Sequence, residues 1–419
     1  MTGFQRFCAF VVVMLLFQPL ACNRKNVVEN PLRIGVLFPM SGSLEEAGLS
    51  NLQAIRLAVE KINSGGGVRS MGGQPLELVY GDTRGQSLIA AREAERLISE
   101  EGVLVIIGAY QSSAAEAAAK VCERLGAPII ISSGMADIIT DRGFQYTFRL
   151  MAKAEHFGRD MVSFLLDFSR LTNRSLHKTA LLYENTAYGT ACAFALKKHL
   201  TSTDLEIAGE VSYRAAGVVD MTQEVEKALD AKPDAILTAM YDHDSLLAAR
   251  AMEASGMDIP LVNMGATMIS RQFVEELGPA VEKYFGMTDY SKLAPYAREI
   301  NQEFKARFHK ELPGECALAY QSVWVIKDAL ERIGTADKKQ IRDALAATYM
   351  LPGPDMILSA PALFFEPSGQ AAHSGSFVVQ VQDGETAPVW PPEYTLLGVR
   401  WKGRSLFFTS SEETPGGVH

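Results

Sequence analysis

The chain has 419 residues, of which 47% are hydrophobic and 21% are charged, and its formal net charge is −9. This length and composition exclude an intrinsically disordered chain and allow two domains of ordinary size. The acidic balance argues against nucleic acid as a partner, because an acidic surface repels phosphates.

The N-terminus reads as an export signal. Arg6 precedes an apolar run that is too short to span a bilayer, so we expect residues 1–21 to be a signal peptide. Cys22 follows a small residue, as in a bacterial lipobox, although Pro19 stands where the lipobox usually has leucine. We expect lipidation at Cys22, a tether over residues 22–32, and a location in the periplasm or on the outer face of the cell membrane. The alternative is a freely secreted protein.

From residue 33 onward, short apolar runs alternate with segments of helical periodicity, which predicts parallel sheets covered by helices. The first series of predicted strands covers residues 33–38, 76–80, 103–107, 127–132 and 146–150. The second series covers 179–184, 206–213, 234–240 and 259–265, with helices over 155–168, 187–200, 220–230 and 244–255. The rest is largely helical over 293–347, with strands near 364–369 and 376–384 and a tail beyond Ser410 that we expect to be disordered. The pattern predicts an α/β protein with two doubly wound parallel sheets in succession.

One stretch, residues 103–116, carries the first indication of a binding site. Its apolar strand lacks polar alternation, as expected of a strand covered on both faces, and Gly108 ends it. Ser112 and Ser113 then begin an alanine-rich helix, whose free N–H groups and dipole attract negative charge. The alternative is that a serine hydroxyl only caps the helix.

The second series repeats this stretch. Residues 104–134 and 236–265 each contain a buried strand, a loop with a tyrosine (Tyr110, Tyr241), a helix ending at glycine, and a proline that opens the next strand. In parallel sheets, ligands bind beyond the carboxyl ends of the strands, so two such edges facing each other would enclose a cleft. The repeat therefore predicts a ligand clamped between two similar lobes.

The sequence lacks the motifs of nucleotide binding and of common hydrolases. The glycine-rich run 64–73 lies between a helix and a strand without a phosphate-loop lysine, and no GxSxG motif is present. Asp242, His243 and Asp244 could form a metal or acid–base group, but neighbouring residues cannot all face one ion, and an aspartate before a helix usually caps it. We expect no metal, no cofactor and no enzymatic activity.

Several motifs together resemble the leucine/isoleucine/valine-binding family of periplasmic binding proteins, the substrate-binding subunits of ABC importers. They are RIGVLFPMSGSLEEAG, GLSNLQAIRLAVEKINSGGGV, LELVYGDTRGQSLIAAREAERLISEEGVLVIIGAYQSSAA and AYGTACAFAL, and the resemblance extends to about residue 392. It implies a Venus-flytrap fold of two lobes joined by three crossovers, near residues 150–154, 286–290 and 361–367. Lobe 1 would comprise 33–152 plus 289–364, lobe 2 would comprise 153–288 plus 365–395, and 396–419 would be a partly disordered C-terminal extension.

The same resemblance implies which residues bind the ligand. A ligand carboxylate would meet Ser112 and the loop from Ser133 to Met135, where Met135 replaces the usual threonine. Tyr241 of the second lobe would close on the solute, and Tyr188 of the Tyr-Gly pair would line the cleft.

Two departures leave the identity of the ligand open. Ala266 aligns with the acid that holds the ammonium group of an amino acid, and Ala47 aligns with an aromatic residue. A buried ammonium ion without a carboxylate is costly, so either Asp242, Asp244 or Glu184 supplies the charge, or the solute is an organic or aromatic acid, or an amide. The implied function is capture of a small carboxylate-bearing solute for ABC permease subunits. The alternatives are a sensor that presents its closed form to a membrane receptor and, less favoured, an exported hydrolase.

Overall fold

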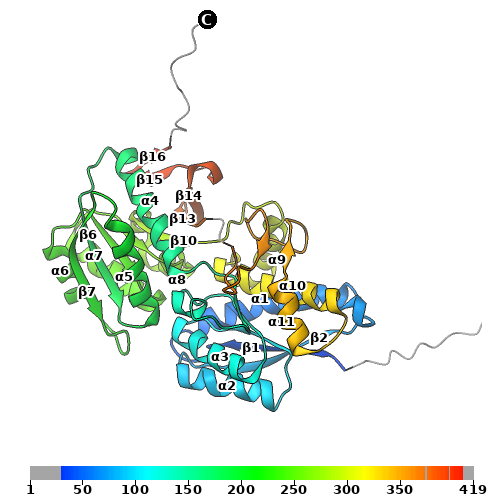
Figure 1. Cartoon of the computed structure of the whole chain (residues 1–419). Coiled ribbons are helices and arrows are strands. Elements are labelled where there is room, and N and C mark those ends of the chain that lie inside the picture. The colour runs from blue at the N-terminus through cyan, green and yellow to red at the C-terminus, as the bar shows by residue number, and fades with distance from the viewer. Residues whose placement is uncertain (1–29, 373–374, 396, 409–419) are drawn as a thin grey trace, which may run out of the picture.

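The computed structural model describes residues 30–372, 375–395 and 397–408; the predicted signal peptide, Cys22 and the tail beyond Ser410 lie outside them. Two lobes, each built on its own sheet, lie side by side (Figure 1). The first sheet is wholly parallel, in the order β2-β1-β3-β4-β5. Its strands are β1 (Leu32–Phe38), β2 (Leu76–Asp82), β3 (Val105–Gly108), β4 (Ile129–Ile131) and β5 (Thr147–Arg149).

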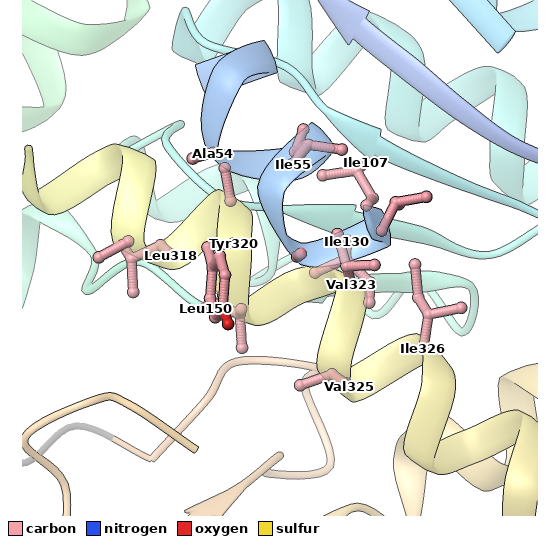
Figure 2. Close-up of a cluster of buried hydrophobic side chains, with 14 of the residues drawn as sticks. Ala54, Ile55, Ile107, Ile130, Leu150, Leu318, Tyr320, Val323, Val325 and Ile326 are labelled. Atoms are coloured by element: carbon pink, nitrogen blue, oxygen red, sulfur yellow. The ribbon is translucent and has the colours of Figure 1, made fainter. Parts of the chain in front are cut away.

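Helices cover both faces of this sheet because its strands are apolar on both sides. They are α1 (Glu45–Ser64), α2 (Ser87–Ser99), α3 (Ser112–Leu125), α9 (Ala297–Phe308), α10 (Gly314–Ile333) and α11 (Lys338–Ala346). Ile107 of β3 faces α1 and α10, whereas its neighbour Ile106 faces α2 and α3. Figure 2 shows α1 and α10 packed together over Ile107 and Ile130, with Tyr320 beside them. A short pair of strands, β11 (Tyr349–Met350) and β12 (Leu363–Phe364), belongs to the same lobe.

The second lobe has a seven-stranded sheet in the order β14-β13-β10-β9-β8-β6-β7. The five strands from β7 to β10 are parallel, and β13 and β14 are added antiparallel at one edge. A strand was predicted where β13 lies, but neither β14 nor the antiparallel edge was predicted. The strands are β6 (Lys178–Glu184), β7 (Glu206–Tyr213), β8 (Ala235–Ala239), β9 (Leu261–Asn263), β10 (Tyr284–Thr288), β13 (Phe377–Gln382) and β14 (Glu385–Trp390). Its helices are α4 (Ala154–Thr172), α5 (Ala187–Leu200), α6 (Thr222–Asp230), α7 (Asp242–Ser255) and α8 (Arg271–Leu277).

The two predicted repeats have the same local structure. Gly126 and Gly256 end α3 and α7 in the left-handed conformation, with φ of 64° and 67°. The proline carbonyl before the next strand accepts a backbone hydrogen bond in both lobes, from Ile106 to Pro128 and from Ile236 to Pro260. The prediction of two similar lobes is therefore confirmed at the level of individual hydrogen bonds.

The described part of the C-terminal extension forms a hairpin that packs on the second lobe. Its strands are β15 (Val399–Trp401) and β16 (Arg404–Leu406), and they lie beyond β14 at the top of Figure 1. The Trp401 ring meets the Phe168 ring of α4 edge to face at 5.2 Å, and Arg400 pairs with Glu282 and Asp383. Among the described residues, no helix is both long and apolar enough to cross a bilayer.

Replacing Trp401 with alanine tests whether the hairpin is part of the second lobe's core. The Trp401 side chain is 5% exposed, so we expect Trp401→Ala to lower the free energy of unfolding by about 3 kcal/mol in urea denaturation. The control is Phe407→Ala, since Phe407 is 62% exposed and its loss should change the free energy by less than about 0.5 kcal/mol. Equal effects of the two substitutions would contradict a packed hairpin.

Candidate functional site between the lobes

The loop between β3 and α3 lies at the carboxyl edge of the first sheet, as predicted. Gly108 ends β3 with φ of 143°, and a Cβ atom there would lie 2.1 Å from the Leu37 carbonyl oxygen, so only glycine fits. The alternative reading, that a serine hydroxyl caps α3, is wrong. Gln111 occupies the N-cap position, and no side chain makes a capping hydrogen bond.

The Ser112 hydroxyl is instead held by the loop that follows β4. Its oxygen accepts hydrogen bonds from the backbone N–H groups of Met135 and Ala136, at 3.0 and 3.1 Å. The neighbouring Ser133 hydroxyl is buried and has no hydrogen-bond partner among the described residues. The predicted residues Ser112, Ser133 and Met135 therefore lie together, at the start of α3 and in the loop after β4 of the first lobe.

Three tyrosine rings connect the lobes at this point. Tyr241 follows β8, and its ring centroid lies 5.7 Å from that of Tyr110 in the first lobe and 5.1 Å from that of Tyr188 in the second. The Tyr188 hydroxyl donates to the Met264 carbonyl oxygen at 3.2 Å, which fixes its ring. Burial raises the pKa of all three phenols, so each stays a neutral hydroxyl. The rings therefore form an aromatic cluster to which both lobes contribute.

A sulfur contact joins the lobes beside the tyrosines. The Cys192 sulfur of α5 lies 3.7 Å from the Met135 sulfur, and both residues are buried. Burial also raises the pKa of the Cys192 thiol well above its ordinary value, so it packs as a small apolar group. Because Met135 belongs to the first lobe and Cys192 to the second, the two lobes are in contact at the predicted ligand loop.

The three acids considered as charge donors have different surroundings. Asp244 is buried and accepts a hydrogen bond from the Tyr213 hydroxyl at 2.8 Å, and Glu184 is buried and bonded to Thr186. Asp242 is the first residue of α7, which excludes the expected capping role, since Tyr241 stands at the N-cap. Burial raises the pKa of Glu184 to about 7, and burial followed by the charge of Glu315 raises the pKa of Asp242 to about 7.

Asp242 faces acids from the first lobe that the sequence analysis did not single out. Glu315 lies in the first turn of α10 and Glu46 in the first turn of α1, and both charges raise the pKa of Asp242. Acids in a first helical turn are common, because they stabilise the positive end of the helix dipole, so this pattern gave no signal of a site. Glu315 and Glu46 act on Asp242 only because the two lobes meet, and the sequence does not show how they meet.

The two positions at which the chain departs from the family pattern lie on separate elements. Ala266 precedes a short 3-10 helix, Thr267–Ile269, just after β9. Ala47 lies in the first turns of α1, packed against the first lobe's core. In the described part of the chain, no group of three or more histidine, cysteine or acidic side chains could hold a metal ion.

Comparisons with known proteins agree with this architecture. The family described as periplasmic binding protein matches residues 31–386. A Leu/Ile/Val-binding protein homolog 7 from Brucella melitensis is 29% identical over 381 residues, which cover 88% of this chain and 94% of the relative. The solved structure of a branched-chain amino acid transporter substrate-binding protein from Streptococcus pneumoniae, in complex with isoleucine, superposes with a TM-score of 0.75 at 23% identity, covering 85% of this chain and 98% of the other. A solute-binding protein from R. palustris, in complex with benzoate, gives 0.74 at 20%, covering 86% and 96%.

The raised pKa of Glu184 predicts a dependence of stability on pH. Between pH 4.5 and about 7 the folded chain keeps the Glu184 proton while the unfolded chain releases it, so this group lowers stability as pH rises through that window. Glutamine cannot ionise. The stability of Glu184→Gln relative to the natural chain should therefore increase by roughly 2–3 kcal/mol from about pH 5 to about pH 8.

Urea unfolding at both pH values measures this difference. Glu226→Gln, on the exposed face of α6, is the control and should show the same difference at both. A pH-independent difference for Glu184→Gln would mean that the Glu184 carboxyl group titrates normally.

Proposed function

The chain belongs to the periplasmic binding protein family, and from this we propose that it captures a small carboxylate-bearing solute between its lobes and delivers it to an ABC importer. It would act in the periplasm or on the outer face of the cell membrane, held by a lipid on Cys22. We propose no chemical step, because binding and release are sufficient for this role. Closure of the lobes would convert ligand binding into a shape that a membrane partner can distinguish.

The observation that carries the proposal is the position of the Ser112 hydroxyl. A hydroxyl group has two acceptor lone pairs and one hydrogen, and at Ser112 both acceptor positions are filled by the Met135 and Ala136 N–H groups. The Ser112 hydroxyl can therefore make a further hydrogen bond only as a donor, through its hydrogen. A donor at the edge of a parallel sheet, beside the unpartnered Ser133 hydroxyl, favours a ligand that brings acceptor oxygens, such as a carboxylate.

The tyrosines favour a ligand whose other end is apolar or flat. Tyr110, Tyr188 and Tyr241 present neutral rings from both lobes, and aromatic faces pack well against aliphatic and aromatic groups. The two structural relatives carry isoleucine and benzoate, which are both small carboxylates with an apolar body. We therefore propose a branched-chain amino acid or a related organic or aromatic acid.

Asp242 is our candidate for any ammonium group on the solute. All three acids are hydrogen-bonded within the second lobe: Asp244 to Tyr213, Glu184 to Thr186 and Asp242 to Ser270. Asp242 differs from the other two because it directly follows Tyr241 and because the charge of Glu315 in the first lobe acts on it, so its own charge can act on a solute held between the tyrosines. This would replace the acid that Ala266 lacks.

Thermal shift measurements across a panel of solutes test the binding proposal. The panel contains L-isoleucine, L-leucine, L-phenylalanine, benzoate and 3-phenylpropanoate, so that acids with and without an ammonium group are compared. We expect at least one acid to raise the melting temperature, since a ligand that binds only the folded state stabilises it. In Ser112→Ala, affinity for that acid should fall by roughly tenfold, the worth of one hydrogen bond to a charged group.

Tyr241→Phe is the companion variant, since it keeps the ring and removes only the hydroxyl. It should bind more weakly than the natural chain while keeping its melting temperature without ligand. Unchanged affinity in both variants would remove Ser112 and Tyr241 from the site. Failure of every acid to shift the melting temperature would contradict the proposal.

Delivery to an importer is tested separately in cells. Deleting the gene should abolish uptake of the radiolabelled solute, and a copy with an intact cleft should restore it. Restoration should fail with the Ser112→Ala copy at solute concentrations below its weakened dissociation constant, because transport follows occupancy. Normal uptake after deletion, together with loss of a transcriptional response to the solute, would favour the sensor alternative.

A further inference from the structure

A buried arginine lies directly behind the proposed ligand loop. Arg149, the last residue of β5, is 0% exposed, and its guanidinium group donates to four oxygens. They are Gly134 O at 3.1 Å, Ala136 O at 2.7 Å, Gln370 Oε1 at 2.6 Å and Thr140 Oγ1 at 2.7 Å. All four acceptors are neutral, so the hydrogen bonds satisfy the geometry of the group without neutralising its charge.

The two carboxylates whose charges act on Arg149 contact other groups instead of its guanidinium group. In the described ranges, no carboxylate lies within 4.0 Å of the guanidinium nitrogens, and the charges that act on Arg149 come from Asp137 and Asp141. Asp141 pairs with Lys153 at 2.9 Å, and Asp137 accepts the Glu155 N–H. Burial lowers the pKa of Arg149 to about 10, so it remains protonated at neutral pH. A buried cation without an ion pair is costly, and an incoming anion would reduce that cost.

The Gly134 carbonyl, the Met135 N–H group and the Ser112 hydroxyl form a chain of hydrogen bonds that starts at Arg149, and in each bond the donor is on the Arg149 side. Arg149 donates to the Gly134 carbonyl oxygen, and the same peptide unit carries the Met135 N–H, which donates to Ser112 Oγ. Ser112 Oγ accepts two such bonds, which leaves its hydrogen as the position through which it can bind a further group. Hydrogen bonds arranged head to tail polarise one another, so the charge of Arg149 strengthens the Ser112 hydroxyl as a donor.

We propose that Arg149 is a positioning residue that acts through the Gly134–Met135 peptide and Ser112, making the cleft select an ionised carboxylate over the neutral amide of the same shape. The inference rests on the proposed function and narrows it, since it separates acids from amides as ligands. Arg149 does not touch the solute. It also ties the ligand loop to residue Gln370, whose amide donates to the Met151 carbonyl oxygen at 3.0 Å, next to where the chain leaves the first lobe.

A matched pair of substitutions at Thr140 changes only the charge beside Arg149. Thr140→Asp places a carboxylate against the guanidinium group and neutralises it, whereas Thr140→Asn has the same shape, keeps an acceptor oxygen and adds no charge. Calorimetry gives the ratio of affinities for benzoate over benzamide and for L-isoleucine over L-isoleucinamide. We expect this ratio to fall by roughly tenfold in Thr140→Asp and to stay close to the natural value in Thr140→Asn.

A second pair guards against misfolding at position 140. Arg149→Lys keeps the positive charge and should keep the preference for acids, whereas Arg149→Met should lose it; circular dichroism establishes that each variant is folded. An equal acid-to-amide affinity ratio in Thr140→Asp and Thr140→Asn, or an unchanged ratio in Arg149→Met, would overturn the role of Arg149 while leaving the proposed function intact. If the natural chain bound an amide more tightly than the corresponding acid, only the role of Arg149 would be overturned. Failure of the natural chain to bind any of these acids would overturn both.

Discussion

The structure depends on how the buried guanidinium of Arg149 is satisfied. Four neutral acceptors from three segments surround it, and each is held in a fixed position as a result. Two of them are carbonyl oxygens of the loop after β4, one belongs to the segment after β12, and one to Thr140. The Arg149 side chain therefore connects its own strand, β5, to the loop after β4 and to the segment that leads to the second lobe. Movement of any one of them would expose a buried charge or leave it without partners.

Parallel strand order places both ligand loops where they can meet. In each lobe the carboxyl ends of the central strands lie at one edge, so the loops after β3 and β8 occupy equivalent positions. The two lobes meet there through aromatic rings and through the sulfur atoms of Met135 and Cys192. Such contacts are apolar and lack the directionality of hydrogen bonds, so they can be exchanged for contacts with a solute at modest cost. We regard this as the physical basis for closure without a chemical step.

Most of the fold was predictable because it follows from local patterns. Strands buried on both faces give uninterrupted apolar runs, and the helices between them show a regular period, so most strands and helices were predicted close to their observed bounds. The exceptions in the second lobe include β10 and α8, for which no element was predicted. The antiparallel strands β13 and β14 were not predicted as part of the second sheet, since a strand pattern gives no partner or direction. The hairpin at Trp401 was missed because two three-residue strands carry almost no periodic signal.

The candidate site was predictable only in part, for a different reason. Ser112 was identified as a polar group near a strand end, but its actual partners could not be predicted, because the N–H groups of Met135 and Ala136 come from a loop 23 and 24 residues away. From local sequence alone, a helix cap was the obvious alternative role. Arg149 lies in the predicted strand 146–150 and was not predicted as part of the site. A charged residue inside a buried strand must have partners, and that requirement was the available signal.

The charged groups of the cleft are of both signs. In our proposal Arg149 and the Ser112 hydroxyl favour an anion at the first-lobe loops, whereas Asp242, Glu315 and Glu46 contribute acidic groups from both lobes. Burial raises the pKa of both Asp242 and Glu315, and the charge of Glu315 raises that of Asp242 further, so a proton or a cation at Asp242 lowers the cost of its burial. A solute with an ammonium group would take the place of that proton. A solute without one would leave the carboxyl of Asp242 to bind its own proton.

Loss of the family's acid at Ala266 therefore does not by itself exclude amino acids. It moves the decision to Asp242, whose pKa of about 7 lets it serve either kind of ligand at neutral pH.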